Sequence, residues 1–320
     1  MKKEGLAYCD LHRSQSIIKY SYYIFVYYVQ VRQLVNKINV GEEKVSIIEI
    51  NQETCNKCGI CVEECPRRVI TLPDGGFPQV AAPAEVACNG CGHCVAVCPS
   101  GSLNNRNSPL EISPKIQGSL KLTPEQIEQL LKSRRSVRVF KNKPVSREII
   151  ARLIDDARYA PTGHNLQEVE WLVIDNKKEL DHIEELGIDW LQWVIKNLPQ
   201  AAAESNMEEK LERQKLKHDA FLRGAPVLIV THASKNSPVS LLGGIDSANA
   251  LSFLDLAANS LGLATCWAGY VYIMANTFPP VKEALALPED HATYGCVLLG
   301  YNKFKYHRIP VRKVPRIVWR

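Results

Sequence analysis

Eight of the eleven cysteines lie in two copies of one spacing. The copies are Cys55-x2-Cys58-x2-Cys61-x3-Cys65-Pro66 and Cys88-x2-Cys91-x2-Cys94-x3-Cys98-Pro99. Three thiolates spaced in this way can reach three corners of one iron–sulfur cube, while the fourth, followed by proline, reaches another cube. A zinc site also uses C-x2-C pairs, and a disulfide framework needs a secreted chain. Neither alternative explains three such cysteines in each copy, repeated together with Cys-Pro.

The repeated run resembles that of bacterial two-cluster ferredoxins, in which the ligands cross over between the copies. We therefore expect one [4Fe–4S] cluster on Cys55, Cys58, Cys61 and Cys98. A second [4Fe–4S] cluster is expected on Cys88, Cys91, Cys94 and Cys65. Glycines inside the copies support this interpretation, because backbone without a side chain can approach a cluster closely. His93 is expected to be a neighbour of the second cluster rather than a ligand.

The composition places the chain in a broad class. With 320 residues, 46% of them hydrophobic, it can bury a large core and form two or three domains. The formal charge of +5 is small for this length, so we expect no nucleic-acid partner. Cys9, Cys266 and Cys296 are scattered singly, which argues against disulfides. A reducing cytoplasm suits both the free thiols and the clusters, and we expect a cytoplasmic protein.

Residues 1–44 are expected to form an N-terminal extension. They contain an aromatic run from Ile17 to Val29 that is interrupted by Lys19. The run is shorter than the roughly 18 apolar residues of a membrane helix, and no small-residue cleavage site follows it. We therefore expect neither a membrane span nor a signal peptide.

A ferredoxin domain is expected over residues 45–108. A strand is predicted over 45–50, and two short runs on either side of Pro73-Asp74-Gly75-Gly76 predict a hairpin. The offset between Cys55 and Cys88 agrees with an internal duplication. The stretch from Gly101 to Gly118 is rich in Asn, Ser, Pro and Gly, which predicts a linker after the ferredoxin domain. We place this linker at residues 109–121.

Residues 122–320 are expected to form a second domain. Thr123, Pro124 and Gln126 predict a capped helix start, and Ser146 caps an apolar stripe that ends at Ala157. A long apolar stretch from Ala248 to Leu261 predicts another helix, stopped by Gly262. Strand-like runs lie between these helices, at 170–174, 227–231 and 295–299. This alternation predicts an α/β or α+β domain.

A cluster of cationic side chains lies where the first helix of this domain is expected to end. It contains Arg134, Arg135, Ser136 and Arg138. Guanidinium groups bind phosphate oxygens in bidentate fashion, and a serine hydroxyl adds a neutral donor. Taken alone, such a run is more commonly a solvated helix end.

Together with three later motifs, this cluster resembles the FMN-dependent nitroreductase family. The motifs are the segments 160–167, 259–269 and 299–312, and the resemblance covers residues 122–320. It implies a homodimer with an α+β sheet core and a flavin at the dimer interface. The residues that it assigns to FMN are Arg134, Arg135, Ser136 and Arg138, then Pro161, Thr162, Gly163 and Asn165 from the partner subunit, and Ala268, Gly269, Arg308 and Arg312.

Two departures from the family accompany this resemblance. Arg138 stands where family members often carry lysine. Between Gly187 and Arg223, the asparagine that contacts the pyrimidine edge of the flavin in the family has no clear counterpart. This segment is expected to form either packing helices or a lid over the substrate pocket. Cys266 and Trp267 are expected in the core, and His164 is a loop residue that could donate a proton. No catalytic side chain is assigned.

The fold class implied is thus a small two-cluster ferredoxin domain fused to an FMN-dependent, nitroreductase-like α+β domain. The function implied is a flavin oxidoreductase that receives electrons through two [4Fe–4S] clusters and reduces a small organic acceptor, such as a nitroaromatic, a quinone or an activated alkene. A redox donor protein or NAD(P)H supplies the electrons, and no G-x-G-x-x-G nucleotide motif is present. The alternatives are an electron carrier or a redox sensor without turnover of a small molecule.

Overall fold

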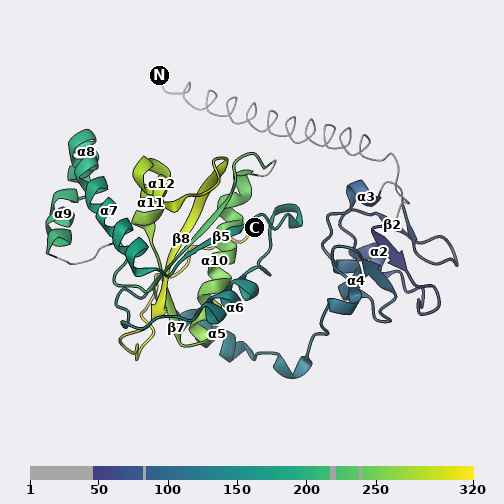
Figure 1. Ribbon diagram of the computed structural model, residues 1–320. Coiled ribbons are helices and arrows are strands. Elements are labelled where there is room, and N and C mark those ends of the chain that lie inside the picture. The colour runs from purple at the N-terminus through teal and green to yellow at the C-terminus, as the bar shows by residue number, and fades with distance from the viewer. Residues whose placement is uncertain (1–45, 82–83, 217–220, 238–239) are drawn as a thin grey trace, which may run out of the picture. The chain divides into compact units, whose positions relative to one another are not determined.

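The computed structural model describes residues 46–81, 84–216, 221–237 and 240–320 (Figure 1). The expected N-terminal extension and its aromatic run lie outside these residues. Among the described helices, none combines the length and the apolar character needed to cross a membrane. The chain divides into two compact units between Gly118 and Ser119.

The first unit consists of short elements around a small core. Its elements are β1 (Ile48–Ile50), α2 (Ile60–Glu64), β2 (Ile70–Thr71), β3 (Gln79–Val80), α3 (Ala84–Ala87), α4 (His93–Val97) and β4 (Leu103–Asn105). Strand β1 pairs antiparallel with β4, and β2 pairs antiparallel with β3. The core combines aliphatic side chains with two cysteines of the repeated motif, Cys61 and Cys94.

The duplication in the sequence is visible in the backbone of this unit. Helices α2 and α4 have the same length, and each begins after a glycine in the left-handed region, Gly59 with φ 74° and Gly92 with φ 70°. Each helix also ends at the fourth cysteine of its motif, and both of these cysteines have extended backbone. The two copies therefore fold alike.

The linker-like stretch from Gly101 to Gly118 contains one strand that the sequence analysis missed, just before the expected linker at residues 109–121. Residues 103–105 form β4, and Asn105 pairs with Ile48 at the far end of the unit's sequence. Its polar side chains gave no strand pattern, so only the long-range pairing reveals it. Downstream of β4 the chain forms two short 3-10 turns, Leu110–Ile112 and Gly118–Leu120.

The second unit has an antiparallel sheet with helices on both faces (Figure 1), and its α+β class is confirmed. Its helices and strands are α5 (Pro124–Ser133), α6 (Arg147–Ala157), β5 (Glu170–Ile174), α7 (Lys177–Asn197), α8 (Pro199–Glu204), α9 (Met207–Lys215), β6 (Val227–Ser234), α10 (Gly243–Ser260), β7 (Leu263–Trp267), α11 (Gly269–Thr277), α12 (Pro279–Leu285) and β8 (His291–Tyr301). The strand order is β5-β6-β8-β7.

Two hydrophobic cores cover the opposite faces of this sheet, because side chains alternate along each strand. On β6, Leu228 and Val230 belong to the core that includes helices α7, α11 and α12, whereas Val227 and Ile229 belong to the core with α6 and α10. Strand β6 is buried along nearly its whole length, as expected for a central strand covered on both faces.

The predicted helix starts are present. The Thr123 hydroxyl accepts a hydrogen bond from the Gln126 backbone amide, and the Gln126 side chain accepts one from the Thr123 amide, which completes a capping box. Ser146 likewise caps α6 through the Ile149 amide. At the other end of the unit, residues 303–320 form an exposed tail without helix or strand.

Candidate functional site

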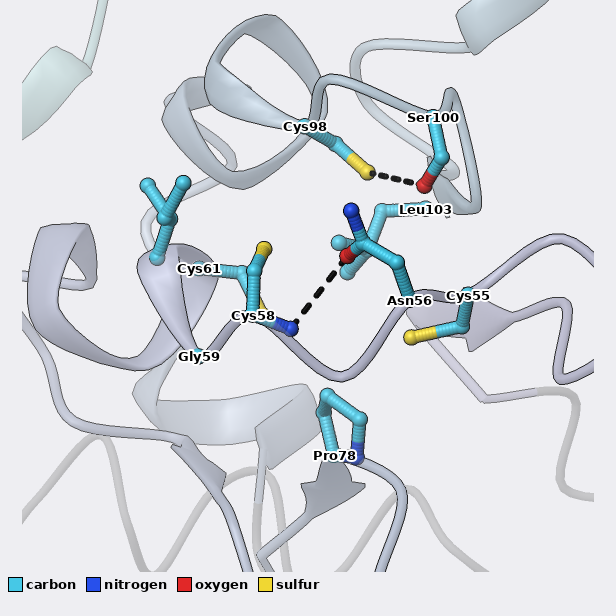
Figure 2. Close-up of a pocket in the computed structure, with 10 residues that line it drawn as sticks. Cys55, Asn56, Cys58, Gly59, Cys61, Pro78, Cys98, Ser100 and Leu103 are labelled. Atoms are coloured by element: carbon cyan, nitrogen blue, oxygen red, sulfur yellow. Dashed lines mark hydrogen bonds between the residues drawn. The ribbon is translucent and has the colours of Figure 1, made fainter.

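The first unit contains a cavity bordered by four motif cysteines. Cys55, Cys58, Cys61 and Cys98 line it together with Pro78. Figure 2 shows Cys98, which follows α4, on the opposite side of this cavity from the loop and helix that carry the other three. The structure thus gathers three thiols of the first copy with the last thiol of the second.

A second cavity repeats this arrangement. It is lined by Cys65, Cys88, Cys91 and Cys94, and also by His93. The Nδ1 atom of His93 lies 3.0 Å from Oε1 of Glu64, on the other helix of the unit. The grouping in both cavities is the one that the crossed motif predicts, and ligation of iron by these thiols stays a prediction.

The thiols differ in their surroundings. Burial and the neighbouring cysteines raise the pKa of Cys61, and burial raises the pKa of Cys94 to about 11. At Cys98 burial also raises the pKa, but hydrogen bonds from Ser102 and Ser100 outweigh it, so that its pKa is lowered. The Ser102 amide lies 3.3 Å from Sγ of Cys98. Thiols must lose their protons to ligate a metal, and burial opposes this loss. The positive charge of a bound iron–sulfur cluster stabilises the thiolates, so these cysteines fit such a cluster.

Two polar groups also contact a motif sulfur: the backbone amide of Gly90, one of the motif glycines expected to approach a cluster, and the side chain of Asn105, which the sequence analysis did not single out. The Gly90 amide donates to Sγ of Cys88 at 3.4 Å, and the Asn105 side-chain amide lies 3.7 Å from the same sulfur. Asn105 is 1% exposed and belongs to β4. Hydrogen bonds to the ligating sulfurs tune the potential of a cluster, and these two groups are placed to donate them to Cys88. In the sequence Asn105 is one of three asparagines between 104 and 107, and nothing there marks it as buried.

In the second unit, the arginine cluster lies beside the edge strand β7. Ser136 forms a bridge with Thr265, and the Val137 amide donates to the Thr265 carbonyl at 2.9 Å. Arg134 is partly committed already, because its Nη1 lies 3.2 Å from Oδ2 of Asp255 on α10. Arg135 and Ser136 are half-buried, and Arg138 is exposed.

One cation of this region was missed by the sequence analysis. Burial raises the pKa of Cys266 on β7, while the charges of Arg223, Arg138 and Arg134 lower it. Arg223 therefore lies close enough to the same strand to act on it electrostatically. It occupies a left-handed turn, with φ 57°, before β6. A single arginine beside Gly224 was too weak a signal to be singled out.

The same strand leads into the residues predicted to line a flavin ring. Ala268 is buried and its amide donates to the Cys296 carbonyl at 2.8 Å, and Gly269 begins α11. Only two residues separate Thr265, beside the arginines, from Ala268. The structure thus brings the arginine cluster and the turn between β7 and α11 together within one chain.

The expectation that Cys266 and Trp267 are both core residues is half wrong. Cys266 is buried, but Trp267 is 44% exposed. Trp267 is the last residue of an edge strand, directly before the turn into α11, so helices do not cover it fully.

The loop with Pro161, Thr162, Gly163 and Asn165 lies elsewhere. The Gly163 amide donates to both carboxylate oxygens of Asp246, at 3.1 Å each, near the start of α10. Asp255, the partner of Arg134, is nine residues further along the same helix, which corresponds to about 14 Å. Within one chain this loop is therefore separated from the arginine cluster.

The loop has an unusual backbone. His164, Asn165 and Gln167 all have positive φ values between 53° and 59°. The Thr162 hydroxyl accepts a hydrogen bond from the Gln167 amide and closes the loop. His164 is exposed. Strained loops of this kind persist when the surrounding structure holds them, and they occur often at binding sites.

Arg308 and Arg312 lie in the exposed tail of residues 303–320. Among the described residues, no hydrogen bond or ion pair joins them to the arginine cluster. Their predicted phosphate contact stays a prediction.

Residues 131–301 match the family model described as the nitroreductase family. The chain belongs to the nitroreductase family. Residues 37–103 match the model of a 4Fe-4S dicluster domain. The predicted fusion of a two-cluster domain with a nitroreductase domain is therefore confirmed.

Two curated relatives match more than half of the chain. A protein of Methanothermobacter thermautotrophicus, provisionally named NADH dehydrogenase/NAD(P)H nitroreductase, is 23% identical over 60% of this chain and 84% of its own. A protein of the same name from Archaeoglobus fulgidus is 25% identical over 56% of this chain and 87% of its own.

Solved nitroreductases with bound FMN give TM-scores just below 0.5. One from Bacteroides fragilis has a TM-score of 0.48 and 23% identity, over 60% of this chain and 99% of its own. One from Desulfitobacterium hafniense has a TM-score of 0.47 and 25% identity, over 62% of this chain and 99% of its own.

Proposed function

We propose that this nitroreductase is an FMN-dependent oxidoreductase in which two [4Fe–4S] clusters deliver electrons to the flavin, for reduction of a small organic acceptor. The observation that carries the proposal is the presence, on one chain, of two complete four-cysteine cavities and a nitroreductase domain. A two-cluster unit transfers single electrons, whereas organic acceptors of this class take electrons in pairs, and bound FMN supplies the conversion between the two.

The residues of the second unit fit FMN chemically. Arg135, Ser136 and Arg138 would hold the phosphate and the electron-rich edge of the flavin, because guanidinium groups bind phosphate and stabilise negative charge. Arg223 adds a further cation on the same side. Ala268 and Gly269 would line the ring. FMN, rather than a larger dinucleotide, suits a basic region of this size and agrees with the family resemblance.

Arg134 differs from the other arginines of the cluster because it already binds a carboxylate. One side of its guanidinium group binds Asp255, so it orients the cluster of cations as well as contacting the phosphate. Arginine has five donors in a fixed fork, and one carboxylate does not exhaust them. We assign it mainly a positioning role.

The proposal includes a homodimer. Pro161, Thr162, Gly163 and Asn165 would reach the flavin of the partner subunit, since they lie far along α10 from the arginines of their own chain. Exposed apolar side chains support an interface: Phe253 is 43% exposed on α10, and Val311 and Trp319 in the tail are 96% and 88% exposed.

The test is rapid mixing of the anaerobically reconstituted full chain with a reduced external ferredoxin. Flavin reduction and turnover of a nitroaromatic are followed in the wild type and in Cys58→Ser and Cys91→Ser variants. Slow flavin reduction in both cysteine variants, with retained FMN, is the expected result. Cys296→Ala, which changes a fully buried cysteine of the other unit, is the control.

Three outcomes contradict the proposal. Equal rates in wild type and cysteine variants would mean that the clusters are not the electron route. Flavin reduction without turnover of any acceptor would favour an electron carrier or sensor. Fast reduction by NAD(P)H in all variants would assign the donor to the nicotinamide nucleotides and leave the clusters an accessory part.

A further inference from the structure

Three strands bring a carboxylate and two imidazoles together at one end of the sheet in the second unit. Glu170 is the first residue of β5, His232 lies near the end of β6, and His291 is the first residue of β8. Glu170 and His232 are direct partners in the pairing of β5 with β6. The site therefore depends on strand register.

The polar atoms of these side chains face one another. Nδ1 of His232 lies 2.8 Å from Nδ1 of His291. Oε2 of Glu170 lies 4.0 Å from Nδ1 of His232, and Oε1 lies 4.0 Å from Nε2 of His291. One ligand atom from each of the three residues lies within 4.8 Å of the others.

The environment favours a ligand set over a solvated surface group. The side chains of His232 and His291 are only 8% and 10% exposed, while that of Glu170 is 60% exposed. The two facing Nδ1 atoms lie at hydrogen-bond distance, so only one of them can carry a hydrogen there. In a neutral histidine pair, one nitrogen therefore donates and the other accepts. A cation accepts the lone pairs of both nitrogens.

The surrounding backbone orients the two histidines. The register between β6 and β8 shifts between Thr231 and His232, and such bulges redirect side chains locally. Next to His291, Oδ1 of Asp290 lies 3.8 Å from Nε2 of the imidazole. Asp290 is itself held by a 2.6 Å hydrogen bond from the Ser234 hydroxyl. A carboxylate behind a ligating imidazole is a common outer-sphere partner in metal sites.

We propose that Glu170, His232 and His291 bind a divalent first-row cation of the Zn²⁺ type. Two imidazole nitrogens and one carboxylate oxygen suit such an ion, and three protein ligands leave a position for water. Bonds of about 2.0–2.1 Å place ligand atoms about 3.3 Å apart, so the imidazoles need to separate slightly and the carboxylate to approach. Glu170 is exposed enough to make this movement.

The site is separate from the arginine cluster of its own chain. Leu299, the partner of Thr265 beside the arginines, lies eight residues along β8 from His291, which corresponds to about 26 Å of extended strand. A cation here links β5, β6 and β8 at their ends. It stabilises the fold of the second unit, because a ligand that binds only the native state shifts the unfolding equilibrium.

The test uses the full chain with its clusters assembled, so that the cysteines are occupied. Equilibrium dialysis against Zn²⁺ is followed by metal analysis and by thermal unfolding. Wild-type protein is expected to bind about one zinc per chain in excess of any bound by a variant without the site. The exposed substitution Glu170→Gln should weaken zinc binding at least about tenfold, since even outer-sphere changes commonly cost this much. His291→Ala should abolish it, and zinc should raise the melting temperature only when the site is intact.

His182→Ala is the matched control, because His182 also lies near a glutamate, Glu185, but on the exposed face of α7. It should bind zinc like the wild type. X-ray absorption should show nitrogen and oxygen around the zinc. The proposal is overturned if the wild type binds no zinc, if Glu170→Gln and His291→Ala bind it as tightly as the wild type, or if the zinc has sulfur ligands.

Discussion

Arg134 and Asp255 form an ion pair, with Nη1 of the arginine 3.2 Å from Oδ2 of the aspartate. Asp255 is 8% exposed and also accepts a 2.5 Å hydrogen bond from the Thr265 hydroxyl. The pair therefore ties the end of α5 and the edge strand β7 to the long helix α10. An arginine of the proposed flavin region is thus at the same time part of the packing of the unit.

We expect Arg134→Ala to destabilise the second unit. It leaves a buried carboxylate without its cation, and because Arg134 is partly exposed we expect a loss of about 2 kcal/mol, less than for a fully buried pair. Unfolding in urea followed by tryptophan fluorescence reports on this unit alone, since all five tryptophans lie between residues 171 and 319. Adding Asp255→Asn should restore part of the loss. An unchanged stability in Arg134→Ala would mean that the ion pair contributes nothing.

Arg135→Ala should affect the cofactor rather than stability. Arg135 has no assigned carboxylate partner among the ion pairs of the described chain, so its removal should weaken FMN binding while the cluster absorbance stays intact. Flavin content after gel filtration is the measurement. Arg152→Ala, an exposed arginine of α6, is the control. Stoichiometric FMN in Arg135→Ala would contradict the phosphate assignment.

Paired cysteine substitutions should reveal which thiols share a cluster. We expect about eight iron and eight sulfide per chain in the reconstituted protein. Cys65→Ser with Cys91→Ser removes two thiols of the same cavity and should lose no more iron than either single variant. Cys61→Ser with Cys65→Ser removes one thiol from each cavity and should lose the iron of both. Equal losses in the two double variants would refute the crossed grouping.

The two glycines before α2 and α4 should differ in their tolerance of alanine. Both have positive φ, which costs about 1–2 kcal/mol for an alanine. At Gly92 a Cβ would also lie 2.3 Å from the Ser108 hydroxyl and 2.7 Å from its Cβ, whereas at Gly59 the nearest atom is the end of the Leu72 side chain at 3.2 Å. Gly92→Ala should therefore lose cluster absorbance on heating at a lower temperature than Gly59→Ala. The reverse order would contradict this close approach.

The sequence predicted the features that depend on residues close together in the chain. Two Cys-x2-Cys-x2-Cys runs, the Thr123 to Gln126 capping box and the Ser146 cap are local patterns, and the structure contains each feature within a few residues of its expected position. Strand β4 was missed because its partner lies at the other end of the unit and its own residues are polar.

Contacts between distant residues could not be predicted in this way. Asp255 lies within an apolar stretch, and nothing in its neighbours indicates that Arg134 binds it. The cluster of Glu170, His232 and His291 likewise exists only because three strands pair in a particular register. Single-residue signals become informative only when the fold brings them together.

The pH dependence of stability should change in Asp246→Asn. Burial is the largest influence on Asp246 and raises its pKa, although the Gly163 hydrogen bonds lower it. With a folded pKa above the unfolded value of about 3.9, its contribution to stability is full below that value and is lost as the pH rises through the folded pKa. An asparagine oxygen can still accept from the Gly163 amide. Relative to the wild type, Asp246→Asn should therefore gain stability as the pH rises.

Tryptophan-detected unfolding at a series of pH values measures this difference. Asp246→Ala is the control, because it removes the acceptor of the Gly163 amide at every pH and should be less stable than Asp246→Asn throughout. A growing deficit of Asp246→Asn with rising pH would show that the ionised carboxylate is favoured in the folded chain.

The exchange of one cysteine between the two copies also sets an order of assembly. The thiols of the second cavity are Cys65, Cys88, Cys91 and Cys94, so that cavity has its full set before Cys98 is synthesised. The cavity that begins with Cys55 must wait for Cys98, the last of the eight to leave the ribosome. The cavity that is begun first is thus completed last, and a chain interrupted between the two copies could complete neither.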